Sequence, residues 1–194
     1  MSTSMSMSTA RGGRTVALIS GLRPLISYTL RRMSLERFHE AQASRWAGYD
    51  TALAEIQTGG KRSHWIWYIF PQIEGLGRSS TARLYAMRDL GEACAYLRDP
   101  ILRTRYEEIV AAVSEQLGRG IRVEDLMGGR TDALKLVSNL TLFRAAAEQL
   151  GREDPTFASL AERLAALLAQ TSAQGYAACD FTLARIDSVK PDIQ

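Results

Sequence analysis

The chain has 194 residues, of which 46% are hydrophobic and 23% are charged, a composition that suits one globular domain with or without a tail. No window approaches 18 consecutive apolar residues, so the sequence predicts no membrane span and favours a cytoplasmic protein. The net charge of +3 is uneven: residues 1–33 contribute +5, so residues 34–194 sum to −2. This slightly acidic balance argues against nucleic-acid binding.

The N-terminal 33 residues differ in composition from the rest. Residues 1–13 are rich in Ser, Thr, Met and Gly, which predicts disorder. Residues 15–32 are apolar with arginines and no acids. Three interpretations remain open: a dispensable or mistranslated extension with Met33 as the working start, a transit-like or membrane-surface amphipathic segment, or an ordered extra helix. We therefore divide the chain into an extension (1–33, disordered or loosely helical), a helical domain (34–188) and a tail (189–194).

From residue 34 onward the sequence carries helix signals in succession. Good cap residues stand before apolar periodic segments, and Gly or Pro follows them. The predicted helices are Leu35–Arg45 capped by Ser34, a second with the stripe Trp46, Tyr49, Leu53 and Ile56, then Thr81–Met87, Leu90–Leu97, a long helix after Asp99-Pro100, Val123–Met127, one capped by Thr131 or Asp132, one after Asp154-Pro155, and a short closing element at Phe181–Ile186.

The aromatic stretch from Ser63 to Phe70 is the densest in the chain. We interpret it as a helix buried on all sides, capped by Ser63 and stopped by Pro71. No βαβ spacing accompanies it, and one β-like segment cannot form a sheet. The predicted fold is therefore all-α, a single multihelical domain of about seven to eight helices.

Metal or cofactor chemistry has little support. The two cysteines, Cys94 and Cys179, lack CxxC spacing, which favours reduced, buried thiols. The two histidines, His39 and His64, stand on different elements, so we predict no metal site and no cofactor. The GxSxG and HExxH motifs are absent, and the sequence does not identify a reaction.

Candidate site residues flank the aromatic stretch on both sides. A helix starting at Ser63 would place His64 in its first turn as a neutral base or donor. The free N–H groups at the start of that helix, close to Lys61 and Arg62, would favour the binding of an anion. One tryptophan ring could stack on a ligand, and a glycine-containing loop could approach a phosphate. The ligand-binding candidates here are Lys61, Arg62, Trp65, Trp67, Gln72, Gly77, Arg78 and Ser79.

A second group of candidates lies at residues 132–143. On a helix, Asp132, Lys135 and Ser138 or Asn139 fall at steps of three and four, a polar stripe. The chain has 21 arginines and only three lysines, which suggests that an ammonium group is needed at positions 61 and 135. An exposed Asp132–Lys135 surface pair is the alternative interpretation.

The sequence resembles a bacterial family, domain of unknown function 1810, over about residues 34–186. The resemblance rests on the strings SHWIWYIFPQ and GLGRSS after Lys61-Arg62, together with Asp132, Lys135 and Thr141-Leu142-Phe143. Asn139-Leu140 departs from that pattern, which has a small residue and then Met there. The resemblance implies a small, all-helical, single-domain protein without an assigned activity.

Two functional hypotheses follow from these residues. In the first, a pocket between Ser63–Phe70 and Asp132–Phe143 binds an anionic or nucleotide-like metabolite, with His64, Asp132 and Lys135 as candidate catalytic groups and Ser138 as a further ligand contact. In the second, the chain is a non-catalytic structural or interaction module whose aromatic motif is core. Neither predicts an oligomeric state.

Overall fold

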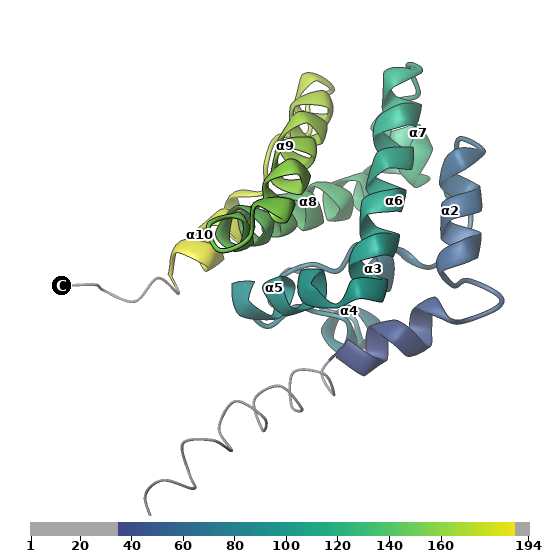
Figure 1. Cartoon of the computed structure of the whole chain (residues 1–194). Helices are drawn as coiled ribbons and strands as arrows, with labels where there is room; N and C mark the ends of the chain where they lie inside the picture. The colour runs from purple at the N-terminus through teal and green to yellow at the C-terminus, as the bar shows by residue number, and fades with distance from the viewer. Residues whose placement is uncertain (1–34, 189–194) are drawn as a thin grey trace, which may run out of the picture. The chain divides into compact units, whose positions relative to one another are not determined.

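The structure is a computed structural model that describes residues 35–188; residues 1–34 and 189–194 lie outside the described part, as do the predictions made for the extension, the Ser34 cap and the tail (Figure 1). Residues 35–188 belong to one compact unit. The described part is helical and contains no strand, which confirms the all-α fold. After a first helix at residues 35–42, its elements are α2 (Tyr49–Gln57), α3 (Ile66–Ile69), α4 (Ser80–Leu84), α5 (Leu90–Arg98), α6 (Pro100–Gly118), α7 (Val123–Met127), α8 (Arg130–Gly151), the 3-10 turn η1 (Pro155–Phe157), α9 (Ala158–Ala173) and α10 (Asp180–Asp187).

Helix α8 is the central element of the described residues. It packs against α5, α7, α9 and α10. Helix α2 packs against α6 (Figure 1). Every residue from 136 to 143 is buried, so this part of α8 is covered all round. Helices that are apolar on one face only leave the other face to solvent. The polar side chains in the middle of α8 must instead find their hydrogen-bond partners inside the protein.

Hydrogen bonds from α8 hold the segments around it. Asn139 Nδ2 donates to the Pro71 carbonyl at 2.7 Å, and the Tyr106 hydroxyl donates to Asn139 Oδ1 at 2.8 Å. Ser138 pairs with Thr182 of α10 at 3.0 Å. The Thr141 hydroxyl accepts from the Cys179 backbone N–H at 3.0 Å. These bonds place the chain after α3 and the chain before α10 along α8.

The aromatic stretch forms a hub that is mostly buried, although Trp67 is only partly buried, so α3 is not covered on all sides as the sequence predicted. Trp65, Tyr68 and Phe70 are buried. The Phe70 ring meets Tyr106 of α6, which in turn lies 4.5 Å, centroid to centroid, from Phe143 of α8. Ring pairs of this kind add about 0.5–1.5 kcal/mol each beyond the area they bury. The hub therefore joins α3, α6 and α8 in one core.

Several predicted helix starts are confirmed by local capping. Asp99 accepts from the N–H groups of Ile101 and Leu102 at the start of α6, whose first residue is Pro100. Asp154 likewise caps the turn η1, which leads into α9. Such starts depend on residues a few positions apart, so the sequence alone predicts them.

Other predicted starts are wrong. The helix predicted from Ser63 is a single turn, α3, that begins at Ile66 without a side-chain cap. Helix α8 begins after Gly129, a position with φ 137° that favours glycine, and neither Thr131 nor Asp132 caps it. Trp46 does not belong to the stripe of α2, because it precedes that helix and is 90% exposed.

Three further differences concern lengths and burial. The first helix ends at residue 42 rather than at Arg45. Helix α4 ends at Leu84, and Met87 forms a parallel bridge with Ile73. Short elements such as α3, α4 and η1 make the helices somewhat more numerous than predicted. Cys94 is buried as expected, whereas Cys179 is only half-buried; both thiols are free of disulfides.

Replacing Asn139 with alanine tests the bonds that α8 makes inside the core. Asn139→Ala removes two hydrogen bonds and leaves the Tyr106 hydroxyl and the Pro71 carbonyl without that partner, so we expect a loss of about 2–4 kcal/mol in the free energy of unfolding. Urea denaturation followed by circular dichroism measures it. Thr104→Ala, on the exposed side of α6, is the control and should change stability by less than about 0.5 kcal/mol. An Asn139 variant as stable as this control would contradict the assignment.

Candidate functional site

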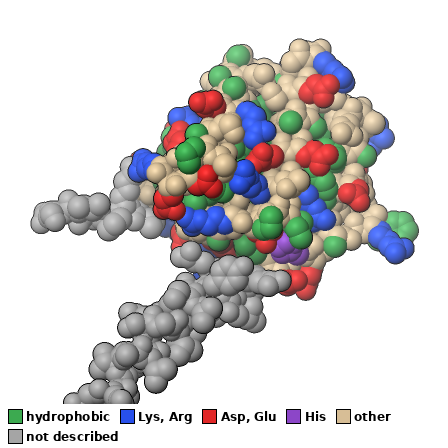
Figure 2. Space-filling view, in the orientation of Figure 1, with side chains coloured by type: hydrophobic (Ala, Val, Ile, Leu, Met, Phe, Trp, Pro, Cys, Tyr) green, Lys and Arg blue, Asp and Glu red, His purple; other side chains and the backbone are tan. Residues whose placement is uncertain are grey.

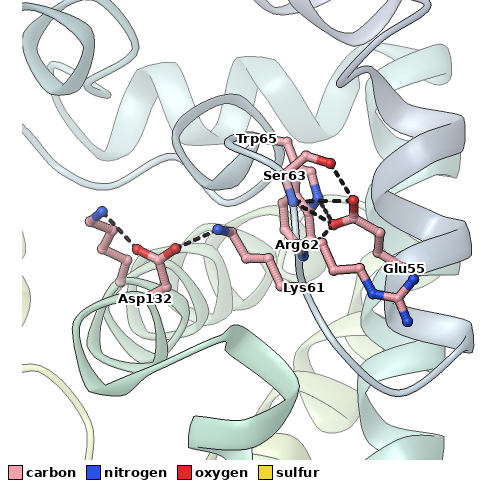
Figure 3. Close-up of polar contacts among 7 residues, drawn as sticks. Glu55, Lys61, Arg62, Ser63, Trp65 and Asp132 are labelled. Atoms are coloured by element: carbon pink, nitrogen blue, oxygen red, sulfur yellow. Dashed lines mark hydrogen bonds and ion pairs between the residues drawn. The ribbon is translucent and has the colours of Figure 1, made fainter.

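Glu55 of α2 organises the segment that precedes α3. Its carboxylate accepts hydrogen bonds from the backbone N–H groups of Arg62 (2.7 Å) and Ser63 (3.0 Å), from the Ser63 hydroxyl, and from Trp65 Nε1 (2.8 Å) (Figure 3). The N–H groups that the sequence offered to an external anion are therefore occupied by the protein's own carboxylate. Sequence analysis missed Glu55, because nothing local marks a helix residue that will fold back on a loop 7–10 residues later.

These donors favour the ionised form of Glu55. Burial alone raises the pKa of Glu55, but the hydrogen bonds from Arg62, Ser63 and Trp65 outweigh burial and lower the pKa to about 2. The carboxylate is therefore charged at neutral pH. Its role is to fix the course of the chain from residue 61 to residue 65.

A second carboxylate, Asp132 in the first turn of α8, binds two lysines. Lys61 Nζ lies 2.7 Å from Asp132 Oδ2, and Lys135 Nζ lies 2.8 Å from Asp132 Oδ1. Figure 3 shows Asp132 and Glu55 on opposite sides of the segment that carries Lys61. Both lysines of the described residues therefore meet at one aspartate. The pair Asp132–Lys135 is part of this larger cluster, not an isolated surface pair.

The cluster is partly removed from water and packed on aromatic rings. The Lys61 side chain is only 8% exposed, and its ammonium lies 5.4 Å from the centre of the Trp65 ring. Lys135 Nζ lies 4.5 Å from the centre of the Trp67 ring, a distance typical of cation–π contacts. Burial raises the pKa of Asp132, yet the hydrogen bonds from Lys135 and Lys61 outweigh burial and lower the pKa below its ordinary value. Two ammonium groups and one carboxylate leave a net charge of +1.

Lys135 faces a cavity of about 610 Å³ beside α8. One wall is α8 itself, the second is the loop from Gln72 to Ala82, and the third is the chain before α10. The lining residues are Trp67, Gln72, Leu76, Gly77, Arg78, Ser79, Ala82, Thr131, Leu134, Lys135, Val137, Ser138, Ala177, Ala178 and Cys179. Two of them are cations, Arg78 and Lys135, and none is a carboxylate. The volume lies within the range of about 300–1,000 Å³ that is usual for small-molecule sites.

The structure brings together only part of the predicted set. Seven candidates from two distant segments line one cavity: Trp67, Gln72, Gly77, Arg78, Ser79, Lys135 and Ser138. Asp132 and Lys61 lie behind Lys135 and not in the wall. Trp65 is fully buried, Arg62 points away as an exposed residue, and His64 is exposed without a hydrogen bond to the described residues. His64, Asp132 and Lys135 thus do not converge on one point.

The third wall was not predicted. Residues 177–179 belong to the connection between α9 and α10, and their sequence, Ala-Ala-Cys, has no feature that marks a site. They reach the cavity because Thr141 binds the Cys179 N–H, because Gln174 accepts from the Val123 N–H at 2.8 Å, and because the Tyr176 hydroxyl donates to Glu124. Thr131 and Leu134 were also missed, although they share the α8 face with Lys135.

Charge on the outer surface is mixed. Figure 2 shows acidic and basic side chains interspersed over the face that it presents. Among residues 35–188, no group of three His, Cys, Asp or Glu side chains gathers as a metal-binding set, and no helix there is long and apolar enough to cross a membrane. The cavity beside α8 is a concave surface lined by two cations and no carboxylate.

These features define an all-helical protein with a small cavity that is lined by cations and apolar side chains. The chain belongs to the family described as "Protein of unknown function (DUF1810)", whose model matches residues 32–180. It is also similar to a solved structure, that of the conserved hypothetical protein Rv1873 from Mycobacterium tuberculosis, with 34% identity, a TM-score of 0.66, and coverage of 79% of this chain and 96% of that one. A search among curated proteins gave no match.

The hydrogen bonds of Glu55 predict a pH dependence of stability. Because the folded-state pKa of about 2 lies below the ordinary 4.5, Glu55 stabilises the fold above pH 4.5 and loses this effect as the pH falls toward 2. Discounted for its partial exposure, the contribution at pH 7 is about 1–2 kcal/mol. Urea denaturation of the wild type and Glu55→Gln should show this difference at pH 7 and little difference near pH 2.

The matched control is Glu74→Gln, an exposed glutamate whose side chain has no hydrogen bond to the described residues. The free energy of unfolding of Glu74→Gln should stay closer to that of the wild type than the value for Glu55→Gln does, across the same pH range. A Glu55→Gln variant that differs from the wild type equally at pH 7 and near pH 2 would contradict the role of the ionised carboxylate.

Proposed function

We propose that the cavity beside α8 binds a small anionic metabolite. The observation that carries the proposal is the composition of the wall: Arg78 and Lys135 face the space from two different segments, and no carboxylate does. A concave surface with cations on opposite walls favours a negatively charged occupant.

Lys135 is suited to hold a fixed position in such a site. Its ammonium is tied to Asp132 and lies over the Trp67 ring, so little side-chain freedom remains to be lost when a ligand binds. An ammonium has three N–H donors, and the ion pair with Asp132 uses one of them. Donor capacity is therefore left for an oxygen of the ligand.

Lys61 determines the charge that the ligand meets. If Asp132 were paired with Lys135 alone, the two charges would offset each other. Lys61 binds the other carboxylate oxygen at 2.7 Å, so the cluster keeps its net positive charge. Lys61, which the sequence suggested as a direct ligand, thus supports binding through Asp132 without lining the cavity.

The rest of the wall is apolar. Trp67, Leu76 and Val137 supply surface for a carbon skeleton, and most sites for small metabolites combine such surface with a few polar groups. The alternative hypothesis, that the aromatic motif serves only as core, explains Trp65, Tyr68 and Phe70, which are buried. It does not explain why Trp67 and the residues after Pro71 border a cation-lined space.

Loss of a single cation from the wall should weaken anion binding without unfolding the protein. We expect inorganic pyrophosphate, ribose 5-phosphate or AMP to raise the melting temperature of the full chain. A ligand present at about 100 times its Kd adds about 2.7 kcal/mol to the free energy of unfolding. Lys135→Met and Arg78→Gln should each raise the Kd about 10- to 100-fold, the effect of one charge-assisted hydrogen bond. Isothermal titration calorimetry measures both.

The controls separate the cavity from general surface charge. Arg83→Gln removes an exposed arginine of α4 that does not line the cavity, and His64→Ala removes the exposed histidine; both should bind as the wild type does. Lys135→Met should remain folded because Lys61 still pairs with Asp132. The proposal fails if none of the three anions binds the wild type, or if Lys135→Met and Arg83→Gln behave alike.

A further inference from the structure

The side-chain amide of Gln72 is a half-buried group of the cavity wall that has no hydrogen bond within the described part of the chain. The Gln72 amide still reaches solvent, so water can occupy its donor and acceptor until a ligand displaces it. A half-buried amide facing a cavity is therefore a group to which a ligand can offer partners.

The backbone holds Gln72 in a fixed place. The Gln72 carbonyl accepts from the Met87 N–H at 2.8 Å, and the Met87 carbonyl accepts from the Glu74 N–H at 2.8 Å. On the other side, Asn139 of α8 binds the carbonyl of Pro71. The residue is thus fixed from both directions while its side chain is free.

Neighbouring polar groups of the wall are already engaged. The Ser79 hydroxyl accepts from the Ala82 N–H and caps α4. The Ser138 hydroxyl pairs with Thr182, and Lys135 pairs with Asp132. The exposed side chains of Arg78 and Thr131 can be hydrated at little cost. Gln72 differs from all of these, since it is both partly shielded from water and without a partner.

An amide recognises a particular kind of chemical group. It presents a C=O acceptor and an N–H donor side by side in one plane. Nucleobases carry the complementary arrangement on their edges, and Gln pairs with adenine in this bidentate way. A phosphate has acceptors only, so it cannot satisfy both atoms of the amide. The flat faces of a base would meet the apolar part of the wall, which includes Trp67, Leu76 and Val137.

We propose that the occupant is a nucleoside phosphate, with its phosphate on Lys135 and Arg78 and the edge of its base on Gln72. This inference rests on the proposed function and specifies the ligand class for the same site. The cavity of about 610 Å³ has room for a ligand of this kind. The phosphate supplies negative charge to a wall that has cations only, and the base supplies hydrogen-bond partners for the Gln72 amide.

Comparison of AMP with ribose 5-phosphate tests the proposal, because the two differ by the base. Calorimetry on the full chain should show AMP binding at least tenfold more tightly than ribose 5-phosphate. Gln72→Met keeps the size of the side chain and removes the amide. It should weaken AMP binding about tenfold and change the Kd of ribose 5-phosphate less than twofold.

Gln57→Met is the matched control, an exposed glutamine of α2 away from the cavity, and it should bind both compounds as the wild type does. Gln72→Glu provides a second variant of the same shape, in which the donor is replaced by an acceptor, and it should also lose the preference for AMP.

The outcomes separate this inference from the proposed function. If the wild type binds AMP and ribose 5-phosphate equally, or if Gln72→Met weakens both to the same extent, recognition of the base by Gln72 is wrong, while anion binding stands. If the wild type binds neither compound, nor pyrophosphate, anion binding itself is wrong and the nucleotide assignment falls with it.

Discussion

The burial of polar side chains in the middle of α8 is the constraint on which the rest of the structure depends. A helix covered on all sides must find partners for Ser138, Asn139 and Thr141 within the protein. It finds them in Thr182, in Tyr106 and the Pro71 carbonyl, and in the Cys179 N–H. These bonds set the two other walls of the cavity against α8. The same interactions that complete the core therefore shape the candidate site.

Two carboxylates divide the polar residues around the aromatic stretch into different roles. Glu55 takes the backbone donors before α3 and fixes the loop, so the N–H groups of Arg62 and Ser63 are not left for an external anion. Asp132 takes the two ammonium groups but does not exhaust their charge. The anion site that we propose consequently lies at Lys135 and not at Ser63. The cavity wall continues into the residues after Pro71, where Gln72 and Arg78 lie.

How much the sequence predicts depends on the range of the interactions involved. The starts of α6 and η1 follow from an Asp-Pro pair and are predictable, as is the burial of Trp65 and Phe70. The start at Ser63 is not, because its hydroxyl and N–H bind Glu55 from the preceding helix instead of capping their own. The wall formed by residues 177–179 cannot be predicted from the sequence either, because the hydrogen bonds that hold it join residues 38 to 52 positions apart.

The scarcity of lysine is the sequence signal that identifies the site best, and the geometry gives its physical reason. An arginine opposite Asp132 would occupy both carboxylate oxygens with its planar fork. An ammonium is a compact donor that needs only one oxygen, so two of them share the carboxylate, Lys61 on Oδ2 and Lys135 on Oδ1. This sharing is what leaves positive charge at the cavity. In a chain with 21 arginines, the two lysines of the described residues stand where each cation has a single carboxylate oxygen to pair with.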